Sequence, residues 1–224
     1  MSNWKVTAIM SSPIAGDVPY LDGLLEFEMA QRQGKAYQVQ RCEPCPPIGA
    51  IHIPCLRGDC GEVRGIPRCS APIYTVAVER HEHFAKRIAV EHASLLSENQ
   101  RLVVATGNSW TKSYRLPVHT RSIEKVVWFV GGSKRQSLRS LLKSVHSLGK
   151  KRSQGFGRVA EWDFEEVEHD WSWFAKVPEG TVLMRRLPFC EQLPKDLIGY
   201  KRTFGGVAAP LWHPDRQMEI VVPC

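Results

Sequence analysis

The residues best suited to chemistry lie in one stretch, Gly149 to Arg158, which reads GKKRSQGFGR. Its first glycine precedes three cations (Lys150, Lys151 and Arg152), and Phe156 lies between its other two glycines. Glycine permits positive φ and close backbone approach, and successive free N–H groups in such a loop form a concave anion site. Lys and Arg add hydrogen bonds to phosphate, and an aromatic ring can stack on a base. The stretch therefore predicts a loop that binds the phosphates of a nucleic acid.

The charge around this stretch is one-sided. Residues 125–160 contain nine Lys or Arg and no Asp or Glu, whereas the whole chain of 224 residues has a formal net charge of +7. Such a block is typical of a surface that binds a polyanion. The simpler alternative is a solvated basic helix face followed by a flexible turn. Lys112, Arg115 and Arg121, interleaved with Trp110 and Tyr114, form a second basic-aromatic patch that is equally consistent with an ordinary surface loop.

The loop departs from the known phosphate-binding motifs. A P-loop needs Lys and then Ser or Thr directly after its second glycine, where this chain has Phe156 and Gly157. A dinucleotide-binding fingerprint needs its glycines after a strand, whereas these follow an expected helix. Residues 154–162, QGFGRVAEW, share chemistry with the RNA-recognition domain but lack its basic and aromatic positions. Binding of a nucleic-acid strand is therefore favoured over binding of a nucleotide cofactor.

The composition is that of a globular protein. The hydrophobic share is 43% and the charged share 24%, both ordinary for folded domains, and the length suits one large domain or two small ones. No apolar run approaches the ~20 residues of a membrane helix, and the first residues form too short an apolar stretch for a secretory signal. We therefore expect a cytoplasmic protein without membrane partners. Its seven cysteines, an odd number, are expected to be mostly reduced.

The hydrophobic pattern around the loop predicts a strand, a helix, the loop and a second strand. Residues 126–130, VVWFV, have the composition of a buried strand. The helix is expected to begin at the N-cap Ser133 and to end at Gly149. The second strand is expected over 159–167, with an acidic outer face. The expected helix has one apolar stripe, which consists of Leu138, Leu141, Leu142, Val145 and Leu148.

The remaining elements complete an α+β fold in one domain, 1–224. Residues 37–69 contain five cysteines and five prolines, a density that no helix tolerates, so a long irregular insertion is expected there. The predicted parts are a core over about 4–168, the Cys/Pro/Gly-rich insertion over about 37–70 and a C-terminal β extension over about 180–224. Further strands are expected over 5–10, 71–79, 102–105, 181–187 and 219–222, and further helices over 20–34 and 80–99.

Five segments of the chain together resemble a known family. They are Ser11–Glu28 (SSPIAGDVPYLDGLLEFE), His52–Cys55 (HIPC), Lys125–Gly132 (KVVWFVGG), Leu148–Trp162 (LGKKRSQGFGRVAEW) and Leu183–Pro188 (LMRRLP). With the order of strands and helices, they resemble the RAMP superfamily of CRISPR-associated proteins. Within it, the chain looks most like the small backbone subunit of type IV CRISPR effector complexes that caps the 5′ handle of the guide RNA (crRNA).

The resemblance implies a ferredoxin-like (RRM-like) core with a thumb-like protrusion, and binding of guide RNA without catalysis or a cofactor. Implied partners are the repeated backbone subunit, a large subunit, a guide-processing nuclease, a helicase and, in the assembled complex, target DNA. The cysteine-rich insertion departs from the family. Arg158 completes the basic loop, and Lys112 and Arg115 are added from the second patch. The positions that match the family's RNA-binding loop are Gly149, Lys150, Lys151, Arg152, Ser153, Gln154, Gly155, Phe156 and Gly157.

One alternative function is a metal-independent endoribonuclease that processes CRISPR precursor RNA. Such cleavage needs a general base near a 2′-hydroxyl and a cation that stabilises the phosphorane. No spacing in the sequence singles out one base. The candidates are His52, His81, His83, His119 and His146, with Tyr20 and Tyr114 as weaker ones.

Two further alternatives concern zinc and double-stranded DNA. A DNA reader would lay the basic helix 134–143 in a groove, although the apolar stripe of that helix needs burial. A zinc-containing nucleic-acid-binding protein would need four ligands, often as two close pairs. Cys42 and Cys45 have the spacing of one such pair, but Cys55 and Cys60 are more loosely spaced. The zinc candidates are Cys42, Cys45, Cys55, Cys60, Cys69 and His52.

Overall fold

The computed structural model describes residues 1–34, 44–86 and 114–224. Strands predominate in this part of the chain and are accompanied by two α-helices, so the α+β class is confirmed. The candidates Cys42 and Lys112, and the expected strand over 102–105, lie outside the described residues. Neither described helix, of 12 and 8 residues, is long and apolar enough to span a membrane.

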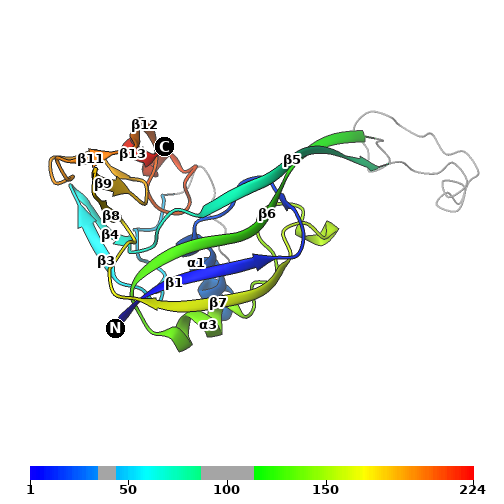
Figure 1. Cartoon of the computed structure of the whole chain (residues 1–224), viewed down its shortest axis with the longest axis horizontal. Helices are drawn as coiled ribbons and strands as arrows, with labels where there is room; N and C mark the ends of the chain where they lie inside the picture. The colour runs from blue at the N-terminus through cyan, green and yellow to red at the C-terminus, as the bar shows by residue number, and fades with distance from the viewer. Residues whose placement is uncertain (35–43, 87–113) are drawn as a thin grey trace, which may run out of the picture.

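The main sheet is antiparallel throughout and carries the glycine loop at one end (Figure 1). Its longest strand has 20 residues, which is enough to pair with one neighbour along its first half and with another along its second half. The strands lie in the order β5 (Ile73–Lys86), β6 (Tyr114–Ser133), β1 (Ser2–Met10) and β7 (Val159–Val167), with the short β2 (Ile14–Ala15) beside β6.

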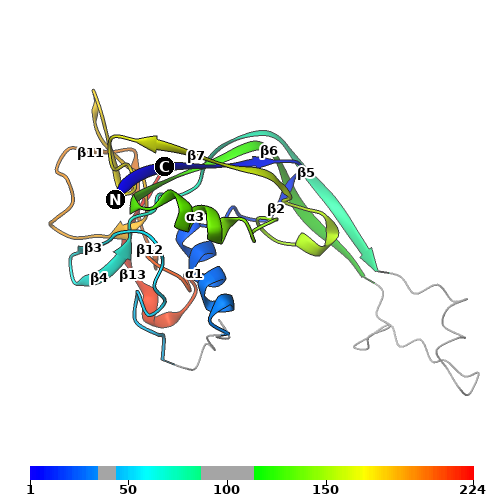
Figure 2. The same ribbon diagram turned by 90° about the horizontal axis from the view of Figure 1, so that it is seen from below.

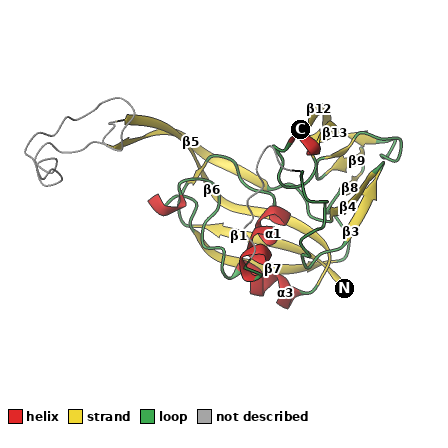
Figure 3. Cartoon of the chain, turned by 180° about the vertical axis from the view of Figure 1, so that it is seen from behind, coloured by secondary structure: helices red, strands yellow, loops and turns green. Residues whose placement is uncertain are grey.

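Helices α1 (Leu21–Arg32) and α3 (Arg135–Leu142) cover one face of this sheet (Figures 2 and 3). Alternate strand residues face the helices, as the two-residue period of a strand requires. Fully burying such an apolar side chain contributes about 1.5–3 kcal/mol. The buried set comprises Trp4, Val6 and Ala8 of β1, Val126, Trp128 and Val130 of β6, Leu21 and Leu25 of α1, and the α3 residues Leu138, Leu141 and Leu142.

The second helix is shorter than its apolar pattern predicts. The N-cap position belongs to Lys134, while Ser133 still lies in β6 and its hydroxyl donates to the Pro54 carbonyl. The helix ends at Leu142, so the prediction that Gly149 is its C-terminal glycine is wrong. Residues 143–149 leave the helical path because they pair with other segments, through a bridge of Ser147 with Arg158 and hydrogen bonds of the loop with β2. Val145 and Leu148 are nevertheless buried, as the stripe predicts.

The cysteine-rich insertion is more ordered than predicted, and its described part, 44–70, packs into the body of the protein. It contains an antiparallel hairpin of β3 (Arg57–Cys60) and β4 (Val63–Pro67). Its apolar residues join both cores of the molecule: Ile53 and Cys69 pack under the main sheet, and Ile66 packs with the C-terminal strands. The element that projects from the body is instead the outer half of the β5–β6 hairpin (Figure 1).

The expected helix over 80–99 is wrong in its described part. Residues 80–86 continue β5 and pair with residues 114–120 of β6. Pairing with a neighbouring strand overrides the weak helix preference of this sequence. The same pairing places Arg115, expected in a surface loop, within β6 opposite Ala85.

The C-terminal part forms two small sheets over a second core. The expected strand over 181–187 is divided, because Arg185 turns inward between its halves. The expected strand over 219–222 lies within β13. One sheet consists of β10 (Leu187–Pro188), β13 (Gln217–Pro223) and β12 (Tyr200–Gly206), and the other of β11 (Leu197–Ile198), β9 (Gly180–Leu183) and β8 (Phe174–Val177).

Arg185 fastens the C-terminal part to the main core. Its guanidinium is 1% exposed and donates to Asp22 Oδ2 at 2.8 Å and to the carbonyls of Cys69 and Val207, each at 2.9 Å. Burial acts to lower the pKa of Arg185, but the charge of Asp22 and its hydrogen bond outweigh burial and raise this pKa above its ordinary value. One side chain thus joins α1, the insertion and the segment after β12.

Candidate nucleic-acid interface

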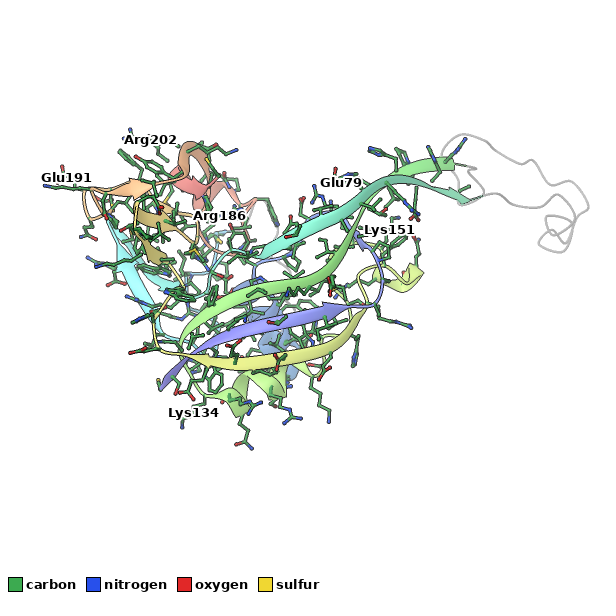
Figure 4. The ribbon with its side chains drawn as sticks, in the orientation of Figure 1. Glu79, Lys134, Lys151, Arg186, Glu191 and Arg202 are labelled. Carbon is green, nitrogen blue, oxygen red and sulfur yellow. The ribbon has the colours of Figure 1, made fainter. Side chains whose placement is uncertain are left out.

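The glycine loop lies between α3 and β7 and is fixed against the segment after β1. The Lys150 amide donates to the Ala15 carbonyl at 2.8 Å, and the Gly157 amide donates to the Pro13 carbonyl at 2.7 Å. Within the loop, the Leu148 amide donates to the Gly157 carbonyl at 2.8 Å, which closes its base. The loop is therefore held at both ends while its tip faces outward (Figure 4).

Two serines that sequence reasoning did not assign to the site hold this loop. The Ser12 hydroxyl donates to the Gly155 carbonyl and accepts from the Arg158 amide, both at 2.8 Å. The Ser11 amide donates to the Arg158 carbonyl at 2.9 Å. Both serines belong to the Ser11–Glu28 segment, which resembles the family, but the sequence did not show that this segment contacts the loop.

The three glycines of the loop serve different purposes. A Cβ at Gly149 would lie 2.6 Å from the Ala15 oxygen, and a Cβ at Gly157 would overlap the Leu148 carbonyl. These two glycines, both with positive φ, let the loop approach the protein's own backbone. Gly155 also has a positive φ, but a Cβ there would meet nothing within 4 Å.

The tip of the loop is a turn with outward-facing donors. Lys151 adopts the left-handed conformation at φ 58°, and the 3₁₀ turn η2 (Arg152–Gln154) follows it. Arg152, Ser153 and Phe156 have backbone N–H groups without a hydrogen-bond partner among the described residues. The residues from Arg152 to Gly155 are exposed, and Phe156 is half-buried. This arrangement resembles the concave amide sites that bind anions.

Cations surround these amides. Lys150, Arg152 and Arg158 are exposed, and none forms an ion pair within the part of the chain that the structure describes. Lys150 and Arg152 line a cavity of about 300 Å³ together with Asp17. The Asp17 carboxylate is 94% exposed and lies 3.7 Å from Arg121, which offsets its charge. The loop thus presents positive potential to solvent.

A second basic surface follows α3 toward β7. Arg139, Lys143 and His146 line a groove of about 530 Å³ whose other wall includes Glu161 and Trp162. The apolar stripe of α3 is buried under the sheet, so only the basic side of the helix is accessible. This burial argues against the double-stranded DNA reader, which would need an accessible recognition helix.

Among the described residues of the second patch predicted from sequence, Arg121 approaches the loop cavity through Asp17, 3.7 Å away, and Arg115 does not. Arg115 is exposed in the projecting hairpin and forms no hydrogen bond or ion pair with the loop residues that the structure describes. Lys112 lies outside the described residues.

The candidate histidines are dispersed. His81 and His119 face each other across the β5–β6 hairpin with ring centroids 5.0 Å apart, and His119 Nε2 lies 3.5 Å from Glu79. His83 lies opposite Pro117 on the same hairpin. His52 lines a separate cavity of about 440 Å³ beside α3. Only His146 lies on a basic groove close to the loop.

The weaker candidate bases are tyrosines in other places. The Tyr20 hydroxyl accepts a hydrogen bond from Arg186 Nε at 2.9 Å, and Tyr114 begins β6. The structure therefore brings no pair of candidate bases to the loop among the residues it describes.

Four of the six described cysteines form two separate thiol pairs. Cys60 Sγ lies 3.3 Å from Cys190 Sγ in the C-terminal core, and Cys69 donates to Cys55 across 3.9 Å under the main sheet. Burial and the Cys190 thiol raise the pKa of Cys60 to about 12. The Cys55 thiol and burial raise the pKa of Cys69 well above its usual value. No group of three or more metal-ligating side chains occurs in the described ranges.

A comparison of the sequence with models of known protein families shows which family the chain belongs to. Residues 72–223 match the family described as CRISPR type IV associated protein Csf3. The chain belongs to the Csf3 family. The matched residues include β5 through β13 and the whole glycine loop, and they exclude the segment of Ser11 and Ser12. No curated protein matches the chain.

Proposed function

We propose that this Csf3-family protein is a non-catalytic subunit of a type IV CRISPR ribonucleoprotein that binds guide RNA and caps its 5′ handle. The observation that carries the proposal is the loop 149–158. Its outward amides and the cations Lys150, Arg152 and Arg158 suit a ribose–phosphate strand, and a family of CRISPR proteins makes guide RNA the relevant strand. Phe156 is half-buried, so part of its ring is accessible to pack against a ribose or base.

We further propose that the main sheet and its two helices form a ferredoxin-like core. The order along the chain is β1, α1, β5, β6, α3, β7, and the spatial order of the strands is β5, β6, β1, β7. These two orders support a split β-α-β fold in which the insertion over about 37–70 and the C-terminal strands are additions. The loop then follows the second helix of that core, where the resemblance implies RNA contact.

The proposal also includes a non-catalytic role and a set of partners. We assign no catalytic role to His146, because no second candidate histidine or tyrosine lines its groove, whose described lining also includes Arg139, Lys143 and Glu161. We infer that the protein assembles with a repeated backbone subunit and a large subunit, that a guide-processing nuclease and a helicase act with the complex, and that target DNA meets the complex rather than this chain alone. A cytoplasmic location follows from the same role.

The experiment that tests this function is sequencing of the RNA that co-purifies with the assembled complex, with photo-cross-linking to locate its contacts. The expected result is a uniform, repeat-derived 5′ end that cross-links to a peptide containing residues 149–158. Heterogeneous cellular RNA, or cross-links from the 3′ end of the guide, would contradict the proposal.

A further inference from the structure

A second basic-aromatic site lies in a cleft between the start of β5 and the C-terminal strands. The cleft has a volume of about 720 Å³, which is within the range of small-molecule sites. Its polar lining consists of Tyr20, Tyr74, Arg186, Lys201 and the exposed Cys224. No Asp or Glu side chain is among the described residues that line it. The cleft therefore suits an anion that also has a flat apolar part.

Arg186 is fixed at the edge of this cleft (Figure 4). Its Nε donates to the Tyr20 hydroxyl at 2.9 Å, its Nη1 donates to the Gly206 carbonyl at 3.3 Å, and its Cζ lies 4.6 Å from the centroid of the Tyr20 ring. The Nη2 atom has no hydrogen-bond partner within the described residues. A guanidinium held in this way loses little conformational entropy when it binds phosphate.

Lys201 supplies the second cation. It lies on β12, is exposed, and forms no ion pair with any residue that the structure describes. The half-buried ring of Tyr74 and the side chain of Ile73, which is 42% exposed, provide an apolar surface in the same cleft. Stacking on such an aromatic ring is the usual way in which proteins hold single-stranded bases.

The cleft adjoins the glycine loop through the segment Gly16–Tyr20. A Cβ at Gly16 would lie 3.0 Å from the Lys150 side chain, Pro19 lines the cavity of the loop, and Tyr20 lines the cleft. Four residue steps separate the Cα atoms of Gly16 and Tyr20, which is at most about 15 Å. A strand leaving the loop is thus within a short distance of the cleft.

We propose that this cleft binds one nucleotide of a single strand, with its phosphate at Arg186 and Lys201 and its base against Tyr74. The proposal rests on the proposed function, because it extends the path of the guide RNA from the loop to the C-terminal strands. The chemistry recognised is that of any single-stranded nucleotide, so the test includes both RNA and DNA.

The test uses the purified full chain and the trinucleotide UUU with 4-thiouridine at its centre, in ribose and deoxyribose forms. Binding is measured in a protein whose loop already has Lys150, Arg152 and Arg158 replaced by Ala, so that the contribution of the loop is reduced. Lys201→Glu in that protein is expected to weaken binding about tenfold. Lys195→Glu makes the same charge change at an exposed lysine outside the cleft and is expected to weaken binding less than twofold.

A second variant and a cross-link test the base contact. Tyr74→Leu keeps apolar packing but removes the ring, and is expected to weaken binding at least fivefold. The thiouridine is expected to cross-link to a peptide that contains Tyr74. Stronger binding of the ribose form indicates guide RNA, and stronger binding of the deoxyribose form indicates a DNA strand; either supports the cleft.

The proposal is overturned if Lys201→Glu and Lys195→Glu bind the trinucleotide equally, or if the cross-link maps elsewhere. It is also overturned if Lys201→Glu leaves trinucleotide binding intact but prevents assembly with the other subunits, because the cleft would then be a protein interface. Failure of the loop changes to weaken binding of a full-length handle would count against the proposed function alone.

Discussion

Two glycines of the loop offer a matched pair of substitutions that separate backbone strain from steric contact. Gly155→Ala and Gly157→Ala each place a methyl group at a residue with positive φ, 90° and 67° respectively. A left-handed alanine costs roughly 1–2 kcal/mol, and at Gly155 nothing else changes because the space around its Cβ is open. We therefore expect Gly155→Ala to lower the free energy of unfolding by about 1–2 kcal/mol.

Gly157→Ala meets the same strain and a clash. The new Cβ would overlap the Leu148 carbonyl, so the chain must move away from it. That movement breaks the hydrogen bonds of Gly157 with Leu148 and with Pro13, at 2.8 and 2.7 Å, and each contributes about 1 kcal/mol. The expected loss of stability is therefore about 3–4 kcal/mol, roughly 2 kcal/mol more than at Gly155.

The assay is urea unfolding of the full chain, with the free energy extrapolated to water and the slope checked for constancy. Binding of handle RNA is measured on both variants at a temperature where both are folded. Gly155→Ala is expected to retain most of the affinity and Gly157→Ala to lose about tenfold, because the loop is displaced from Pro13. Equal unfolding free energies for the two variants would refute the assigned loop geometry.

Three further results are expected. Asp22→Ala leaves Arg185 buried without its carboxylate and is expected to lower the free energy of unfolding by about 3–5 kcal/mol, whereas Glu161→Ala, an exposed control, should leave it nearly unchanged; equal effects would contradict the fastening role of Arg185. The pKa of Cys60 is raised to about 12 in the folded protein, so the folded state retains the thiol proton at pH values where the unfolded chain loses it. The resulting contribution to the free energy of unfolding is complete below the ordinary thiol pKa and is lost as the pH rises from about 9 toward 12. Urea midpoints at pH 8 and pH 10.5 should therefore fall more in the native protein than in Cys60→Ala, and parallel falls would argue against a buried thiol. Labelled repeat RNA should stay intact in EDTA, and a discrete product that disappears in His146→Ala would establish an endoribonuclease instead.

The sequence predicted the elements whose patterns are local. The strands β1 and β7 and helix α1 follow from alternation or helical spacing. All five residues of the expected apolar stripe are buried, although Val145 and Leu148 lie beyond the end of α3. The length of α3 was wrong because its end is set by contacts with Ala15 and Arg158, which are distant in sequence. The apolar pattern predicts which residues are buried, and Val145 and Leu148 are buried although the helix has already ended.

The errors lie where long-range pairing decides the structure. Residues 80–86 have no strand pattern of their own and become a strand through β6. The insertion looked irregular because prolines and glycines dominate it, yet Ile53 and Ile66 anchor it in two cores. Neither residue belongs to a long apolar pattern that would predict its burial.

In the candidate site, too, local features could be predicted from the sequence and long-range contacts could not. Charge and glycine spacing located the loop 149–158, because both are visible along one stretch. The reasons for the glycines were only partly foreseen: Gly149 and Gly157 approach the protein's own backbone. Ser12, Arg186 and Lys201 lie far from the loop in sequence, so only the fold shows their connection with it.

The salt dependence of RNA binding tests the central claim most directly. Replacing Lys150, Arg152 and Arg158 with Ala removes three loop cations, while Lys151 is kept because of its left-handed backbone. Each lost phosphate contact to a single strand reduces the slope of log affinity against log salt by about 0.7, so a reduction of about 2 is expected. The control replaces three exposed cations outside the basic block 125–160 with Ala, namely Arg80, Lys176 and Lys195. A reduced slope in the loop variant alone is the predicted result, and equal slopes in the two variants would contradict the role of the loop.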